Sequence, residues 1–413
     1  MEQNLSRETR TESDLIGSRE VPADALYGVQ TLRGIENFRI SKFHLNEYPL
    51  FINALAITKM GAAVANYELG LLTKEQVDAI LKACKEILEG EHHEQFPVDM
   101  IQGGAGTSFN MNTNEVICNR ALEILGRPRG DYDYISPNNH ANMSQSTNDV
   151  IPTSIRVCAL MRAEQLIIAL ENLADSFDKK GEEFKDVLKI GRTHLQDAVP
   201  ITLGLEFKAF ASSMRRRSSC IRRSCELLHT MNMGATAVGT GLNADPEYIK
   251  EVCEQLTLVT GESFTTADNL VDATSNTDIF TDLSSSLKTS ALSLIKISND
   301  LRLMASGPRA GFCEITLPPR QPGSSIMPGK VNPVIPEVVD QTCYQVIAND
   351  LAVAFGVENG QFQLNVMEPV MAYNIFNSLR FLTNAVNTLR TRCVDGIKAN
   401  RAQCAEWLDK SVG

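Results

Sequence analysis

The chain has 413 residues, 43% of them apolar and 22% charged, a composition typical of globular proteins large enough for two or three domains. Its 39 basic and 50 acidic residues give a net charge of −11, which argues against nucleic acid and against an anionic membrane as partners. The sequence contains no uncharged apolar run near the roughly 18 residues that a membrane-spanning helix needs. The N-terminal segment MEQNLSRETRTESD lacks the apolar core of a signal peptide.

Ten cysteines are scattered singly, and none forms a CxxC pair. This spacing is not that of a zinc site, and the density is not that of a small disulfide-rich scaffold. We therefore expect reduced thiols and a cytoplasmic location.

The first half of the chain contains short elements. Residues 1–45 are polar and are expected to form an extended arm, and helical periodicity begins at Leu50. Thr73 and Gln76 have the spacing of a capping box, so a second helix is predicted to start there and to end at Gly90. A glycine-rich break (IQGGAGTSFNMN), another helical piece and a polar loop (SPNNHANMSQSTNDV) follow.

The second half is dominated by long helices. Apolar residues recur at three-and-four spacing in five segments, at about 148–188, 203–231, 277–304, 336–365 and 369–389. Pro152 lies near the start of the first segment, where a missing N–H is tolerated. These helices are far longer than the usual 11 or 12 residues, as is typical of a bundle. The prediction is an all-α protein with a long-helix bundle and a smaller, mainly helical N-terminal domain.

Three segments are expected as domains. Residues 1–147 form the N-terminal domain, residues 148–397 the central long-helix bundle, and residues 398–413 the start of a C-terminal domain that is otherwise absent from the sequence.

Two short motifs resemble nucleotide sites without satisfying them. Gly323 to Lys330 has five residues between its glycines instead of the four of a phosphate loop, and Val331 follows where Ser or Thr is needed. The stretch GTGLNA (239–244) matches the loose dinucleotide fingerprint, but its flanks are helical rather than a strand–helix–strand unit. No cofactor is therefore expected.

Four polar loops between helices hold the candidate site residues. They are Thr107 in GGAGTSFNMN, Ser146, Thr147 and Asn148 in SQSTND, Thr193 and His194 in GRTHLQDAVP, and Ser324, Ser325, Lys330 and Asn332 in GSSIMPGKVNP. Singly, SQSTND could merely cap a helix, and His194 could be a structural histidine. Together the loops offer hydroxyls, amides, one imidazole, one ammonium group and backbone N–H groups. Such a set suits a small dianion with two carboxylates.

Two other polar stretches have simpler interpretations. His92, His93 and Glu94 could suggest a metal site, but adjacent residues seldom converge on one ion, so a solvated turn is favoured. The basic run RRRSSCIRR (215–223) indicates ion pairs on a helix surface or a subunit contact.

At the four loops the sequence resembles the aspartase/fumarase superfamily. GSSIMPGKVNP contains the superfamily signature GSSxMPxKxN without departure, and the similarity extends from YGVQTLRGIENF (27–38) to LNVMEPV (364–370). Residues 334–337 (VIPE), where fumarases typically have TQCE, and MNMGATAVGTGLN (231–243) are similar to the aspartase branch, the aspartate ammonia-lyases.

The resemblance implies roles for the candidate residues. Ser324, on a mobile lid at 316–326, would be the base that takes a proton from carbon, with His194 and Lys330 as the other catalytic groups. The remaining assignments concern the substrate: Thr107, Ser146, Thr147 and Ser325 around its β-carboxylate, Lys330 and Asn332 at its α-carboxylate, Asn148 with His194 at its amino group, and Thr193 beside them.

The resemblance also implies an assembly. It predicts a homotetramer with a central bundle of long helices and active sites shared by three chains. No metal is required, although a divalent cation activates some relatives. Fumarase, which adds water instead of ammonia, stays an alternative, as does a non-catalytic protein on the same scaffold. Asp340 stands where aspartases commonly have asparagine, and the sequence offers no reason for it.

Overall fold

The computed structural model describes residues 8–411, which form two compact units. Unit 1 consists of residues 8–161, 226–281 and 352–374, and unit 2 of residues 162–225, 282–351 and 375–411. Residues 1–7 and 412–413, which the expected terminal segments include, lie outside the described part. The expected boundaries at 147/148 and 397/398 stay predictions.

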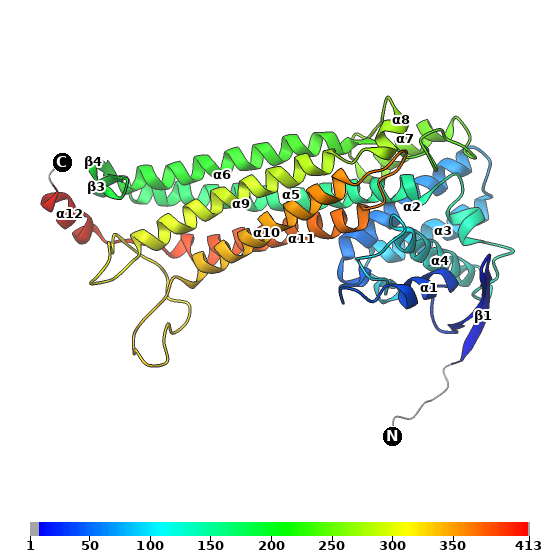
Figure 1. Ribbon diagram of the computed structural model, residues 1–413, viewed down its shortest axis with the longest axis horizontal. Helices are drawn as coiled ribbons and strands as arrows, with labels where there is room; N and C mark the ends of the chain where they lie inside the picture. The colour runs from blue at the N-terminus through cyan, green and yellow to red at the C-terminus, as the bar shows by residue number, and fades with distance from the viewer. Residues whose placement is uncertain (1–7, 412–413) are drawn as a thin grey trace, which may run out of the picture. The chain divides into compact units, whose positions relative to one another are not determined.

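Unit 1 contains the shorter elements (Figure 1). They are β1 (Thr9–Asp14), β2 (Gly17–Pro22), α1 (Val29–Asn37), η1 (Leu45–Glu47), α2 (Pro49–Glu68), α3 (Lys74–Leu88), η2 (His93–Gln95), α4 (Thr107–Ile124), η3 (Pro137–Ala141), η4 (Leu227–His229), β5 (Thr230–Met231), α7 (Tyr248–Thr260), β6 (Thr265–Thr266) and α8 (Leu270–Ser275).

The predicted capping box of α3 is present. The N–H of Gln76 donates to Thr73 Oγ1 at 3.3 Å, and the N–H of Thr73 donates to Gln76 Oε1 at 3.1 Å. The helix ends at Leu88, and Gly90 has φ of +92°, a conformation that favours glycine. Both predicted ends of this helix are confirmed.

Five long helices are also confirmed. They are α5 (Thr147–Glu183), α6 (Leu203–Glu226), α9 (Ile279–Met304), α10 (Val334–Glu358) and α11 (Glu368–Arg392). The fourth ends earlier than predicted, because the side chain of Asn365 donates to the carbonyls of Gly356 and Val357 at 3.0 and 3.2 Å. These carbonyls lie in the last turn of α10, where no further helical N–H reaches them.

Pro152 lies deeper in its helix than the sequence suggested. It is the sixth residue of α5 and lacks the N–H that would reach the carbonyl of Asn148. The side-chain amide of Asn232 donates to that carbonyl instead, at 3.1 Å. The start of α5 is thereby tied to the 231–243 segment.

In unit 2 the long helices lie side by side (Figure 1). On α5 and α6, the rings of Phe177, Phe207 and Phe210 pack with centroids 5.5 to 6.1 Å apart. Ser284 on α9 donates to Asp350 on α10 at 2.7 Å. Packed aromatic rings and buried polar pairs therefore connect neighbouring helices along the bundle.

The strands of unit 2 are local features. They are β3 (Leu188–Thr193) paired with β4 (Gln196–Thr202), and β7 (Ile315–Thr316) paired with β8 (Lys398–Ala399). A short 3-10 turn, η5 (Val394–Gly396), and α12 (Arg401–Lys410) complete the unit. Every sheet in residues 8–411 has two strands, so the mostly helical fold class is confirmed.

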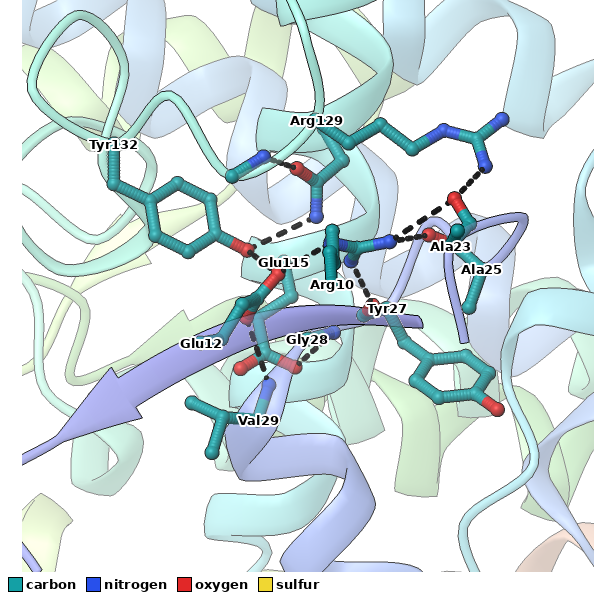
Figure 2. A network of polar contacts seen from close by, with 12 residues as sticks. Arg10, Glu12, Ala23, Ala25, Tyr27, Gly28, Val29, Glu115, Arg129 and Tyr132 are labelled. Atoms are coloured by element: carbon teal, nitrogen blue, oxygen red, sulfur yellow. Dashed lines mark hydrogen bonds and ion pairs between the residues drawn. The ribbon is translucent and has the colours of Figure 1, made fainter. Parts of the chain in front are cut away.

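A buried polar network anchors the N-terminal hairpin in unit 1 (Figure 2). Arg10 donates to Glu12 at 2.8 Å and to the carbonyls of Ala25 and Tyr27 at 2.7 Å each. The other carboxylate oxygen of Glu12 accepts from the N–H of Val29 at 2.9 Å, at the start of α1.

Glu115 on α4 also contacts this turn, and Figure 2 shows it beside Gly28. Its buried carboxylate accepts from the N–H groups of Gly28, Gln30 and Thr31 at 2.8 to 3.0 Å, and from the hydroxyl of Thr31 at 2.6 Å. Orphan N–H groups at the first turn of α1 are thus satisfied by carboxylates.

A second buried pair of charges in unit 1 is different. Arg156 on α5 and Glu368 at the start of α11 are 3% and 1% exposed. Neither carboxylate oxygen of Glu368 has a hydrogen-bond partner among the described residues, and Arg156 Nε and Nη1 also have none. Burial raises the pKa of Glu368 to about 8, although the charge of Arg156 acts in the opposite direction.

The structure gives Asp340 a partner. Its carboxylate on α10 pairs with Arg302 on α9, with an N–O distance of 3.1 Å. Burial raises the pKa of Asp340, and Arg302 opposes that shift. An acidic residue here is therefore matched by a cation on the neighbouring helix.

None of the ten cysteines forms a disulfide in the described part of the chain, and all except Cys220 and Cys313 are buried. Within residues 8–411, no helix combines the length and the apolar character needed to cross a membrane.

Candidate functional site

Thr107 begins α4 in unit 1, directly after a strained turn. Gly104, Ala105 and Gly106 all have positive φ, at +88°, +56° and +87°. The N–H and the hydroxyl of Thr107 both donate to the carbonyl of Gly104, at 3.0 and 2.7 Å. Glycine adopts positive φ without strain, but Ala105 does not, and strained residues of this kind are typical of functional turns.

The first turns of α4 and α5 lie against each other. A Cβ on Gly106 would lie 3.0 Å from the side chain of Ile151, so a residue larger than glycine would force one of them to move. One turn further along α4, the side-chain amide of Asn110 donates to Thr147 Oγ1 at 3.1 Å. The structure therefore brings Thr107 close to the Ser146–Thr147–Asn148 loop.

The side chain of Asp149 fixes the backbone of this loop by hydrogen bonds. Its carboxylate is fully buried and accepts from the N–H of Ser146 at 3.0 Å, of Gly234 at 3.2 Å and of Thr236 at 2.9 Å. Burial raises the pKa of Asp149 to about 6, although the backbone donors and the charge of Lys59 act in the opposite direction. The carboxylate thus ties the loop to the 231–243 segment.

Asn148 is tied to the same segment. Its side-chain amide donates to the carbonyl of Ala237 at 2.7 Å, which turns the amide oxygen the other way. An amide oxygen held in this orientation can accept from an ammonium group.

A buried lysine contacts the residues that precede this loop in the chain. Lys59 on α2 is 1% exposed and donates to Asn142 Oδ1 at 3.0 Å and to Gln145 Oε1 at 2.8 Å. The same oxygen of Asn142 accepts from the amides of Asn110 and Asn114 at 3.1 and 3.2 Å. Burial lowers the pKa of Lys59 to about 7.

In unit 2, Thr193 and His194 lie at the tip of the β3–β4 hairpin. Thr193 pairs with Gln196, and the two residues between them, His194 and Leu195, have φ of +56° and +60°. Two successive positive φ angles are typical of a tight hairpin turn that normally contains Asn and Gly. His194 is exposed in this strained conformation, as is typical of a residue kept for function.

Buried ion pairs fix the base of the hairpin. The fully buried carboxylate of Glu314 lies 2.8 Å from Arg192 Nη1 and 2.9 Å from Lys189 Nζ. Lys189 also pairs with Glu206 at 3.0 Å. A hairpin held in this way presents its tip rigidly.

The signature loop closes on itself. The N–H of Gly323 donates to the carbonyl of Lys330 at 2.7 Å, and the side-chain amide of Asn332 donates to the carbonyl of Gly323 at 3.0 Å. A Cβ on Gly323 would lie 2.7 Å from that same lysine oxygen, so glycine is required there. Gly329, with φ of +83°, provides the return turn.

Within this loop, Ser324 Oγ is an acceptor. The N–H groups of Ile326 and Met327 donate to it at 3.2 and 3.1 Å. Donors aimed at an oxygen favour its anionic form. Ser325 and Lys330 are exposed on the same loop.

Each unit therefore gathers part of the predicted set. Unit 1 brings together Thr107, Ser146, Thr147 and Asn148. Unit 2 holds Thr193 and His194 on a hairpin tip, and Ser324, Ser325, Lys330 and Asn332 on the closed loop. The roles of all ten residues stay predictions.

One group of side chains in residues 8–411 has the spacing of metal ligands. Glu86, Glu91 and His92 place one ligand atom each within 4.8 Å of one another. Glu86 already accepts from Arg120 at 2.5 and 3.0 Å, and a guanidinium in contact opposes a cation. His92 has φ of +64° in a surface turn, as favoured from the sequence.

Several residues of the site were missed in the sequence. Lys59 could have been found, because it is a charged residue within the apolar stretch INALAITKMGAAVAN. Asn110 belongs to a run of asparagines in a buried helix, which is unusual but does not reveal which of them faces the site. Asp149 gave no signal beyond its place in a capping sequence.

Comparison with known proteins places these features in a family. Residues 17–348 match the lyase family. The aspartate ammonia-lyase of a Bacillus species is 53% identical over 99% of this chain and 87% of its own length. That of Pseudomonas aeruginosa is 53% identical over 98% of this chain and 86% of its own length.

Two solved structures are similar throughout. A fumarate lyase/delta crystallin from Brucella melitensis, bound to cobalt, is 52% identical with a TM-score of 0.96, covering 98% of this chain and 88% of that one. The class II fumarase of Schistosoma mansoni is 35% identical with a TM-score of 0.94 and the same coverage.

Proposed function

Because the chain belongs to the lyase family, and within it is most like the aspartate ammonia-lyases, we propose that it catalyses the reversible conversion of L-aspartate to fumarate and ammonia. It is then a carbon–nitrogen lyase. The observation that carries the proposal is the unbroken signature GSSIMPGKVNP, folded into a closed loop in which Ser324 Oγ accepts two N–H bonds.

The reaction has one difficult step. A base must take a proton from the carbon next to the β-carboxylate, and the electron pair must enter that carboxylate to form an enediolate. The pair then returns to form the double bond while the C–N bond breaks, and ammonia leaves with the bonding electrons. Donors placed where the enediolate charge develops lower this barrier.

Four hydroxyl groups supply those donors in the proposal. Thr107, Ser146, Thr147 and Ser325 surround the β-carboxylate. Thr147 Oγ1 already accepts from Asn110, which leaves its own O–H free to donate to substrate. Asn148, with its amide oxygen turned away from Ala237, accepts from the substrate ammonium.

The signature loop supplies the base and the cation in the proposal. Ser324 acts as the base, helped by the N–H groups of Ile326 and Met327 and by exclusion of water when the lid closes. Lys330 and Asn332 hold the α-carboxylate. Thr193 and His194, at the exposed hairpin tip, contact the substrate near its amino group.

The proposed assembly is a homotetramer with each site shared by three chains. Supporting this, α10 exposes a row of large apolar side chains, since Tyr344, Leu351 and Phe355 are each 55 or 56% exposed. They fall within about 40° of one another around the helix, at 100° per residue, and so form one stripe. An apolar stripe of this kind is typical of an interface.

Incubation of fumarate with and without ammonium tests the proposal. We expect loss of fumarate absorbance only when ammonium is present, with aspartate as the product. Malate formed without ammonium would show that fumarase is correct instead, and no turnover in either direction would favour a non-catalytic protein. No metal is needed in this scheme, so activity should persist in EDTA, and stimulation by added Mg²⁺ would reveal divalent activation.

A further inference from the structure

Two buried residues outside the proposed substrate contacts control how the Ser146–Thr147–Asn148 loop is presented. We propose that Asn110 and Asp149 are positioning residues: Asn110 sets the direction of the Thr147 hydroxyl, and Asp149 sets the position of the loop backbone. This inference rests on the proposed function, because it concerns the same site.

The direction of the Thr147 hydroxyl follows from a chain of donors. The Lys59 ammonium only donates, so the oxygen of the Asn142 amide faces it, at 3.0 Å. An Asn142 oxygen in that place needs the NH₂ of Asn110, not its oxygen, at 3.1 Å.

The NH₂ of Asn110 donates its second hydrogen to Thr147 Oγ1, and the nitrogen lies 3.1 Å from that oxygen. The threonine oxygen is therefore an acceptor on its buried side. Its single proton must point away from Asn110, toward the side where substrate would bind. A flip of the Asn110 amide would place its oxygen against Asn142 Oδ1, which also only accepts, so the NH₂ stays turned toward Asn142 and Thr147.

The backbone of the loop is set by a different group. Asp149 accepts from the N–H of Ser146 on one carboxylate oxygen, and from Gly234 and Thr236 on the other. Gly234 and Thr236 both have positive φ, at +90° and +58°. The carboxylate thus holds three N–H groups, one just before α5 and two in the irregular 231–243 segment, and fixes the start of the helix against that segment.

The chain offers a matched control for each residue. Asn112, two positions along the same helix, is equally buried, and its amide donates to the carbonyl of Gln95 at 2.9 Å. Glu115 is a buried carboxylate that accepts from three backbone N–H groups, as Asp149 does, but at the N-terminal turn.

The first experiment compares Asn110→Asp with Asn112→Asp. Aspartate at 110 can only accept, so Thr147 would turn its proton inward and stop donating to substrate. Removing one such donor lowers rates by about 100-fold or more. We expect kcat of N110D to fall by about 100-fold with a smaller change in KM, and kcat of N112D to stay within about twofold of wild type.

The second experiment compares Asp149→Asn with Glu115→Gln. Each change replaces one accepting oxygen with an NH₂ that faces N–H donors, so both variants should lose similar stability. Displacing reacting groups by about 1 Å can cost about 100-fold in rate. We therefore expect kcat/KM to fall about 100-fold for D149N and to stay nearly unchanged for E115Q.

The outcomes distinguish failure of the proposed function from failure of the two positioning roles. If wild-type protein forms no fumarate from aspartate, the proposed function is wrong. If wild type is active but folded N110D or D149N has wild-type constants, the positioning role of that residue is wrong. If both variants fail to fold while both controls fold, the two residues are structural and the inference is overturned.

Discussion

Replacement of Glu368 by glutamine should make the stability of the protein less dependent on pH. The change removes a buried carboxylate that has no hydrogen-bond partner among the described residues, while keeping the shape of the side chain. The pKa of Glu368 is about 8 in the folded chain, against an ordinary value of 4.5. Glutamine does not titrate, so E368Q loses the pH dependence of stability that this difference in pKa causes.

The direction in which pH changes the free energy of unfolding follows from proton binding. Between pH 4.5 and 8 the folded chain holds a proton on Glu368 that the unfolded chain has lost. The free energy of unfolding of the wild type therefore falls as pH rises through this range. Each pH unit contributes about 1.4 kcal/mol, so the whole range contributes about 5 kcal/mol.

Urea unfolding followed by circular dichroism at pH 5, 7 and 9 measures the effect. We expect E368Q to be close to wild type at pH 5 and to become the more stable of the two by several kcal/mol at pH 9. Glu254→Gln, on the exposed face of α7, controls for the loss of a surface charge. A difference between E368Q and wild type that is constant with pH, or that grows toward low pH, would refute the reasoning.

Four other substitutions have definite expected outcomes. Ser324→Ala should lower kcat by about 1,000-fold, as loss of a general base does, while aspartate still binds in equilibrium dialysis; near-normal turnover would remove the serine from that role. Lys330→Ala should raise KM for aspartate by about 10-fold, and an unchanged KM would mean that the lysine serves the loop alone. Asp340→Asn should change the free energy of unfolding by less than about 1 kcal/mol, because its partner Arg302 is 41% exposed, and a larger loss by urea titration would contradict this. Thr73→Ala should cost about 1 kcal/mol through loss of the capping box, and a melting temperature equal to that of wild type would contradict it.

The fold could be predicted from the sequence where patterns are local. Helix α3 was predicted with both ends, because Thr73, Gln76 and Gly90 each act on the nearest turn. The end of α10 was missed, because it depends on Asn365 reaching back from a loop seven residues beyond the last helical residue. Long-range capping leaves no periodic signal.

In the candidate site, too, residues in local motifs could be predicted and residues that act through long-range contacts could not. Ser324 and Lys330 could be found because a short motif contains both, and Thr147 because it belongs to a hydroxyl-rich loop. Asn110 and Asp149 could not be found, since their importance depends on which atoms they face. Asn110 and Asn112 are two residues apart and of one type, and only the folded chain shows that one faces Thr147 and the other Gln95.

The closed form of the 323–332 loop determines how Ser324 and Lys330 move relative to each other. Its neck is formed by Gly323 bonding to Lys330 and Asn332, so Ser324 and Lys330 belong to one ring of backbone. Any displacement that preserves these hydrogen bonds moves the serine and the backbone of the lysine together. In the proposed reaction, the serine and the lysine backbone would then approach the substrate in a single movement of the loop.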